Sequence, residues 1–171
     1  MNLSIDVIRD LFRHMQWADA EVWRALHAHP AALEDEKLRG TMQHLHVVQR
    51  AFLLMWSGGA INPDELYAKR PVDEMIAHAR AYYGEADAFF DAFDMSRAGD
   101  TLHMPWLAHF SEQLGRPLES PAYSESFLQL PMHSTYHRGQ VNARLRELGG
   151  EPPLVDYIAW IWFGRPAPQW P

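Results

Sequence analysis

Histidine is the residue type in this chain that could do chemistry. The sequence contains ten histidines and no cysteine, and histidine is both the commonest metal ligand and a frequent proton-transfer group. His133 and His137 are four residues apart, so on a helix they lie on one face, about one turn from each other. Two imidazoles at that spacing can bind one metal ion. The alternative is two ordinary histidines, hydrogen-bonded at the edge of a core.

A third metal ligand must come from another helix, and the candidates are His44 and His46. At about 100° per residue, the centre of the apolar stripe around them lies roughly 70° from His44 and roughly 130° from His46. His44 is therefore the preferred ligand, and His46 is expected to be a surface residue. A core-edge histidine bonded to a neighbouring helix is the alternative for His44.

The other histidines carry weaker signals. His14 lies beside the apolar line of its helix and could face a pocket between helices, whereas His78 is expected in solvent. His27 and His29 are expected to cap the end of the first helix. His103 and His109 flank a tryptophan in a long connection, and their roles stay open.

Four segments have the helical period of apolar residues that could position these side chains, and no segment alternates with period two. They run over about 5–28, 38–56, 71–95 and 124–149. The sequence therefore predicts an all-α four-helix bundle, built as a single domain over residues 1–171.

Two stretches are predicted to be non-helical. Residues 99–122 mix Gly, Pro, aromatic and polar residues, and form a long connection before the last helix with room for a short hairpin. Residues 151–171 are rich in Pro and Trp and are expected to wrap the bundle as an ordered tail. Within this tail, residues 157–163 are too apolar to stay in water, so they should pack on the body or on a partner.

Composition narrows the range of functions. The chain has 171 residues and a net charge of −7, so it lacks the overall basic character that nucleic-acid binding favours. Without cysteine it has neither disulfides nor thiolate metal sites. No apolar run approaches the roughly 20 residues that cross a bilayer, and the N-terminus has no basic region typical of a secretory signal. We therefore expect a cytoplasmic protein that binds neither nucleic acid nor membranes.

Several motifs, in their order along the chain, resemble the DinB/YfiT-like family. Those on the helices are Gln16–Asp19, His44–Arg50 and His133–Gln140, the last with the pattern H-x-x-x-H-R-G-Q. Leu148–Pro153 and the pair Asp156-Tyr157 follow at the family's spacing.

The resemblance implies a four-helix bundle in which His44, His133 and His137 hold a divalent metal ion. Three neutral imidazoles leave at least one coordination position open. Zinc is the expected metal, and nickel, iron and manganese also suit nitrogen ligands. One departure is Gln49, where many relatives carry an acid, so no acid–base role is expected there.

The resemblance also implies a class of activity. Relatives include thiol-dependent transferases and isomerases that use a low-molecular-weight thiol, and hydrolysis is the competing chemistry on the same ligands. The alternative is a stress-associated bundle that binds a metal or small ligand without turning it over. Because relatives commonly pair, a homodimer is expected.

Side chains near the predicted ligands have candidate roles of their own. Arg138 could hold the tail through a salt bridge to Asp156, or bind an anionic substrate. Gln140 lies within about 20° of the His133 direction on the helix, so it could support the metal ligands. Three aromatic residues are candidate pocket walls, although aromatics in a bundle more often belong to the core: Trp17, Trp106 and Tyr136.

Overall fold

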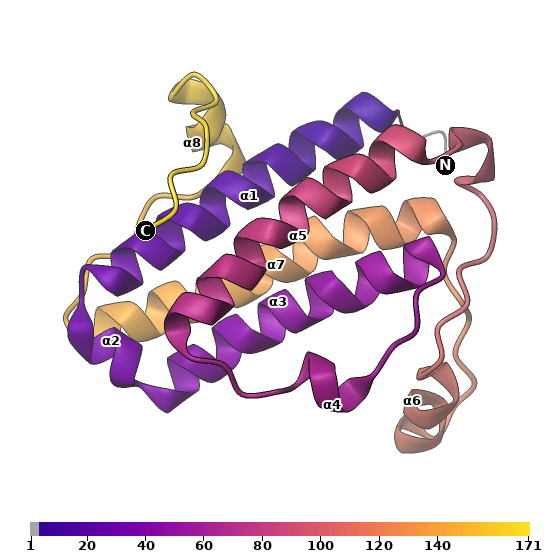
Figure 1. The fold of residues 1–171 in the computed structure, drawn as a ribbon, viewed down its shortest axis with the longest axis horizontal. Helices are drawn as coiled ribbons and strands as arrows, with labels where there is room; N and C mark the ends of the chain where they lie inside the picture. Colours follow the sequence, from indigo (N-terminus) through magenta and orange to yellow (C-terminus); the bar gives the residue numbers. More distant parts are fainter. Residues whose placement is uncertain (1–3) are drawn as a thin grey trace.

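The computed structural model describes residues 4–171 and is an all-α bundle (Figure 1). Its four long helices are α1 (Ile5–His27), α3 (Glu36–Ser57), α5 (Val72–Ala92) and α7 (Tyr123–Glu147). These match the four predicted segments, so the predicted fold class is confirmed. None of the helices in this described part is long and apolar enough to cross a membrane.

Local signals fix where the long helices begin and end. The side chain of Ser4 accepts a hydrogen bond from the backbone N–H of Asp6 and caps α1. Asp35 caps α3 in the same way through the N–H of Leu38. Helix α3 ends at Gly58, whose φ of 70° is a left-handed conformation that glycine adopts without steric cost. Helix α3, which carries the predicted ligand His44, is thus bounded at both ends by local signals.

The core has two main parts along the bundle. In one part, aromatic rings from all four long helices interlock, with Phe12, Trp56, Phe90 and Phe127 in mutual edge-to-face or tilted contacts. In the other, smaller aliphatic side chains surround Trp23. Burial of this apolar surface is the main favourable term that holds α3 beside α7.

The connection between α5 and α7 differs from the prediction. Residues 107–114 form a helix, α6 (Leu107–Leu114), and the hairpin is reduced to one isolated antiparallel bridge between Thr101 and Ala122. The signal was present, because Leu107, Phe110 and Leu114 form a short apolar stripe that ends at Gly115, with φ of 64°. Three further short elements precede this connection or lie within it: α2 (Pro30–Glu34), α4 (Pro63–Leu66) and a 3₁₀ turn, Met95–Arg97.

The C-terminal tail is ordered but not free of helix. It contains α8 (Tyr157–Trp162), which the sequence prediction missed because its run of apolar residues has no helical period. Trp160 is buried and packs with Trp17 of α1. Part of the apolar segment therefore packs on the body, whereas Trp162 and Phe163 stay 74% and 56% exposed.

Candidate metal centre

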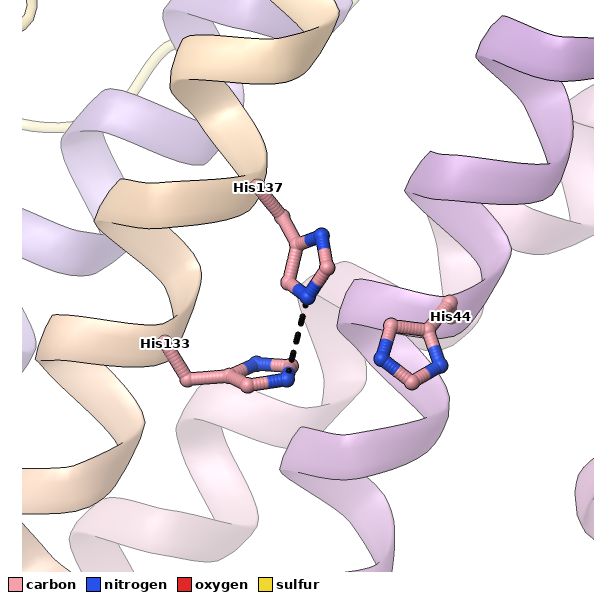
Figure 2. Close-up of side chains that lie close together, drawn as sticks. All are labelled: His44, His133 and His137. Atoms are coloured by element: carbon pink, nitrogen blue, oxygen red, sulfur yellow. Dashed lines mark hydrogen bonds between the residues drawn. The ribbon is translucent and has the colours of Figure 1, made fainter.

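Three histidine side chains meet between two neighbouring helices (Figure 2). His44 comes from α3, and His133 and His137 come from successive turns of α7. Each offers one ligating nitrogen, and these nitrogens all lie within 4.8 Å of one another. In residues 4–171 no other group of three or more His, Cys, Asp or Glu side chains converges in this way. The structure thus brings together the three predicted ligands.

The hydrogen bonds of His137 fix its orientation and its tautomer. Its Nδ1 lies 2.8 Å from Oε1 of Gln140, and an amide oxygen can only accept, so Nδ1 carries the proton. The Nε2 atom of His137 therefore presents a lone pair, and it lies 3.1 Å from Nε2 of His133. In the absence of metal, His133 can donate its Nε2 proton to this lone pair.

The residues present fit a divalent metal ion. The Nε2 atoms of His133 and His137 face each other at 3.1 Å. A cation between the two Nε2 atoms would replace the single proton that they share. The donor set, three imidazoles without a carboxylate or thiolate, suits zinc and other late first-row metals.

Burial favours the neutral form of two of these histidines. Burial lowers the pKa of His44, and the nearby His137 lowers it further. Burial lowers the pKa of His133 to about 4, with smaller contributions from His137 and His44. Both imidazoles are therefore neutral at pH 7, which is the form that binds metals.

Comparison with known families gives a match over nearly the whole chain. The sequence model of the DinB family matches residues 1–167. The chain belongs to the DinB family. No curated protein and no solved structure gives a significant match.

The remaining candidate residues of this DinB-family protein are not all at the metal centre. Gln140 bonds to His137, and Tyr136 lies beside it, 64% exposed, with its ring centroid 5.1 Å from that of His137. Trp17 instead packs against the tail, and Trp106 packs against Phe52 in the core. Of the three aromatic candidates, the structure places Tyr136 against a predicted metal ligand.

The predicted salt bridge between Arg138 and Asp156 is wrong. Nη1 of Arg138 donates to Oδ1 of Asp19 at 2.7 Å, and Nη2 donates to Thr135. Arg138 is 2% exposed, because its place on α7 turns it toward α1 in the bundle interior. Asp156 stays exposed at the start of α8. The guanidinium thus stabilises the bundle and is not presented to a ligand in solvent.

The prediction that His46 is a surface residue is also wrong. It is half-buried, and its Nε2 accepts a hydrogen bond from the indole N–H of Trp23 at 2.9 Å. Its Nδ1 donates to Oε1 of Gln49. With both nitrogens occupied, His46 has no lone pair to offer, so His44 is the ligand available on α3.

The histidines outside the centre have ordinary surroundings. His14 is buried and hydrogen-bonded to the carbonyl of Val155, and His29 bonds the carbonyl of Leu148 beyond the end of α7. The others are exposed: His27, His78, His103 and His109.

Sequence reasoning missed a buried polar cluster next to the metal centre. It consists of Asp19, Gln49, Tyr83, Ser134 and Arg138. One signal could have found it: Asp19 lies four residues after Met15 on the apolar face of α1, where a carboxylate needs buried partners. We refer to these five side chains as the Asp19 cluster.

Proposed function

We propose that this protein binds a divalent metal ion through His44, His133 and His137 and is a metal-dependent enzyme. The observation that carries the proposal is the donor set: within the described residues, three imidazoles converge and no fourth protein ligand joins them. Structural zinc sites usually close all four positions with protein ligands, whereas catalytic sites keep one position open. Zinc is the metal we expect first, with nickel, iron and manganese as alternatives.

The chain's own residues would have separate roles at this centre. The amide of Gln140 holds the imidazole of His137 in the tautomer that can bind a metal. Tyr136 is exposed next to His137, where its phenol can contact a substrate. The metal, when bound, supplies a Lewis acid that can polarise a substrate oxygen or stabilise a thiolate.

We further propose transfer chemistry with a low-molecular-weight thiol as cosubstrate. The chain has no cysteine, so any thiol at the centre must come from another molecule. Zinc binds thiolate sulfur as readily as imidazole nitrogen, and an open coordination position would admit it. Hydrolysis of a small substrate is the competing reaction on the same three ligands.

Metal analysis of protein purified without a histidine tag tests the first step. We expect one metal ion per chain, lost in the double variant His133→Ala/His137→Ala. A matched double variant, His78→Ala/His109→Ala, removes two exposed histidines outside the centre and should retain the metal. Equal metal content in both double variants, or none in the unmodified protein after incubation with zinc, nickel, iron or manganese salts, contradicts the proposal.

A cobalt-substituted protein tests the thiol step. Adding glutathione or 2-mercaptoethanol should produce a sulfur-to-cobalt charge-transfer band, and S-methylglutathione, which has no free thiol, should not. Silence toward both thiols, combined with hydrolysis of model esters that requires the metal, would favour the hydrolase. Stoichiometric metal with neither property would favour a non-catalytic binding protein.

We also propose that the protein is a homodimer. The support is the apolar surface that the tail leaves in solvent, where Trp162 and Phe163 are 74% and 56% exposed; such patches commonly mark contact surfaces. Sedimentation should show a species of twice the 19.7 kDa chain mass at micromolar concentration. A single species of 19.7 kDa would contradict it.

A further inference from the structure

The Asp19 cluster joins the four long helices at one buried point. Its members come from α1, α3, α5 and α7, and each is at most 3% exposed: Asp19, Gln49, Tyr83, Ser134 and Arg138. Buried polar groups are costly unless they are hydrogen-bonded, and a network of this kind fixes the relative placement of the elements that supply it.

The carboxylate of Asp19 is the centre of the network. Its Oδ2 atom accepts from the hydroxyl of Tyr83 at 2.5 Å and from Nε2 of Gln49 at 2.8 Å. Its Oδ1 atom accepts from Nη1 of Arg138 at 2.7 Å. Nε2 of Gln49 also lies 3.2 Å from Oγ of Ser134, which connects α3 directly to α7.

Two of the cluster residues directly follow two of the three histidines along the chain. Ser134 follows His133, and Arg138 follows His137, so each α7 ligand precedes a residue anchored in the interior. Gln49 is on α3, the helix that supplies His44. The two bonds Gln49–Ser134 and Arg138–Asp19 therefore hold α7 to α3 and to α1 at the level of the metal centre.

Small rotations of α7 would matter at this centre. A helix with its side chains has a radius of about 5–6 Å, so a turn of 20° moves a ligating atom by about 2 Å. Metal–ligand distances tolerate only about 0.2 Å. Apolar packing alone permits such shifts more easily than a directional hydrogen-bond network does.

We propose that Gln49 and Arg138, acting through Ser134 and Asp19, are positioning residues that hold His133 and His137 toward His44. The inference rests on the proposed metal site. It also accounts for glutamine at position 49: its amide donates to Asp19, whereas a carboxylate there would face the Asp19 carboxylate at hydrogen-bond distance.

Two variants of graded severity test the inference. Gln49→Glu keeps the side-chain shape and replaces the donor with an acceptor, and Ser134→Ala removes one hydroxyl next to His133. For each, the Kd for zinc is measured by competition, the visible spectrum is recorded with cobalt, and the Tm is recorded without metal. We expect the zinc Kd to rise at least tenfold in Gln49→Glu and about threefold in Ser134→Ala, with shifted cobalt bands.

Arg144→Gln is the matched control. Arg144 bonds Asp35 at the start of α3 and Glu147 on its own helix, so it joins the same two helices without a place in the cluster. This variant should lower the Tm and leave the zinc Kd within about twofold.

The outcomes separate the two proposals. If the unmodified protein binds no metal, the proposed function fails. If it binds zinc and both cluster variants keep its Kd and cobalt spectrum, the positioning role is overturned. Ser134→Ala decides the question if Gln49→Glu does not fold. A Kd that rises equally in Arg144→Gln would also overturn the inference, because general loosening of the bundle would then explain the result.

Discussion

Two histidine–glutamine pairs with the same local geometry occur on neighbouring helices. On α3, Nδ1 of His46 donates to Oε1 of Gln49 at 2.9 Å; on α7, Nδ1 of His137 donates to Oε1 of Gln140 at 2.8 Å. In both pairs the glutamine is three residues after the histidine, and in both it leaves Nε2 of the imidazole with a lone pair.

The pairs differ in what that lone pair meets. Nε2 of His46 accepts the indole N–H of Trp23, whereas Nε2 of His137 faces Nε2 of His133. Both nitrogens of His46 have hydrogen-bond partners, so this imidazole has a structural role in the core. Nε2 of His137 keeps a lone pair that a cation can bind. In both pairs the bond to glutamine leaves Nε2 of the histidine as an acceptor. The side chain that a neighbouring helix places against Nε2 then determines whether the histidine can bind a metal.

Replacing His137 or His46 by alanine should give the largest difference between the two pairs. His137→Ala should weaken metal binding more than about 100-fold, because even residues outside the ligand set cost 10–100-fold. His46→Ala should keep the metal but lower the free energy of unfolding by about 1–3 kcal/mol, since it leaves buried partners unsatisfied. Metal titration and chemical denaturation of the same two proteins check both effects.

The control is His109→Ala, which removes an exposed histidine and should change neither property. If His46→Ala lost the metal while His137→Ala kept it, the assignment of the two pairs would have to be reversed.

The Asp19 carboxylate accepts hydrogen bonds from Gln49, a member of one pair, and from Arg138, which follows His137 of the other, and its neutralisation should be the most destabilising change. Asp19→Asn leaves the buried guanidinium of Arg138 without a counter-charge, and such a change typically costs 3–5 kcal/mol. Denaturant unfolding of the metal-free protein measures the loss. Asp91→Asn, which breaks the exposed pair with Arg9, should cost less than about 1 kcal/mol. Equal losses would show that the Asp19 cluster contributes no more than a surface pair.

A smaller effect is expected when the indole N–H that donates to Nε2 of His46 is removed. Trp23→Phe removes the N–H that bonds Nε2 of His46 and leaves that nitrogen unsatisfied, at a cost of about 1–3 kcal/mol. Trp56→Phe removes a comparable bond, to Ser126 in the other part of the core, and is the matched control. Both should lose stability, but only Trp23→Phe should shift the NMR resonances of the His46 ring.

Much of this arrangement could be predicted from the sequence, since the long helices carry clear periodicity and both predicted ligands on α7 share one face. The preference for His44 over His46 also followed from helix geometry. The surroundings of His46 could not be predicted, because they depend on Trp23 of another helix. The direction of its indole ring cannot be read from sequence periodicity.

The partner of Arg138 illustrates the same limit. Asp19 and Asp156 are both carboxylates on distant segments, and the choice between them depends on the rotation of α7 within the bundle. That rotation results from packing of the whole core. The short helices α6 and α8 were missed for different reasons. The apolar stripe of α6 covers too few periods to separate helix from loop, and the apolar run of α8 has no helical period.

The smallest expected effect concerns the protonation of His14, which is buried outside the metal centre. Burial lowers the pKa of His14 below its ordinary value of 6.5, so the folded protein keeps this imidazole neutral where the unfolded chain binds a proton. The unfolded state therefore gains protons first as pH falls, and stability is lost below about pH 6.5 until the folded-state pKa is passed.

Thermal unfolding of the metal-free protein should show a Tm that falls with pH over this window. His14→Gln should remove part of that dependence, because His44 and His133, whose pKa values burial also lowers, carry the rest, whereas His78→Gln, at an exposed position, should leave it unchanged. An unaltered slope in His14→Gln would mean that other groups carry the acid sensitivity, and that burial does not hold this imidazole neutral.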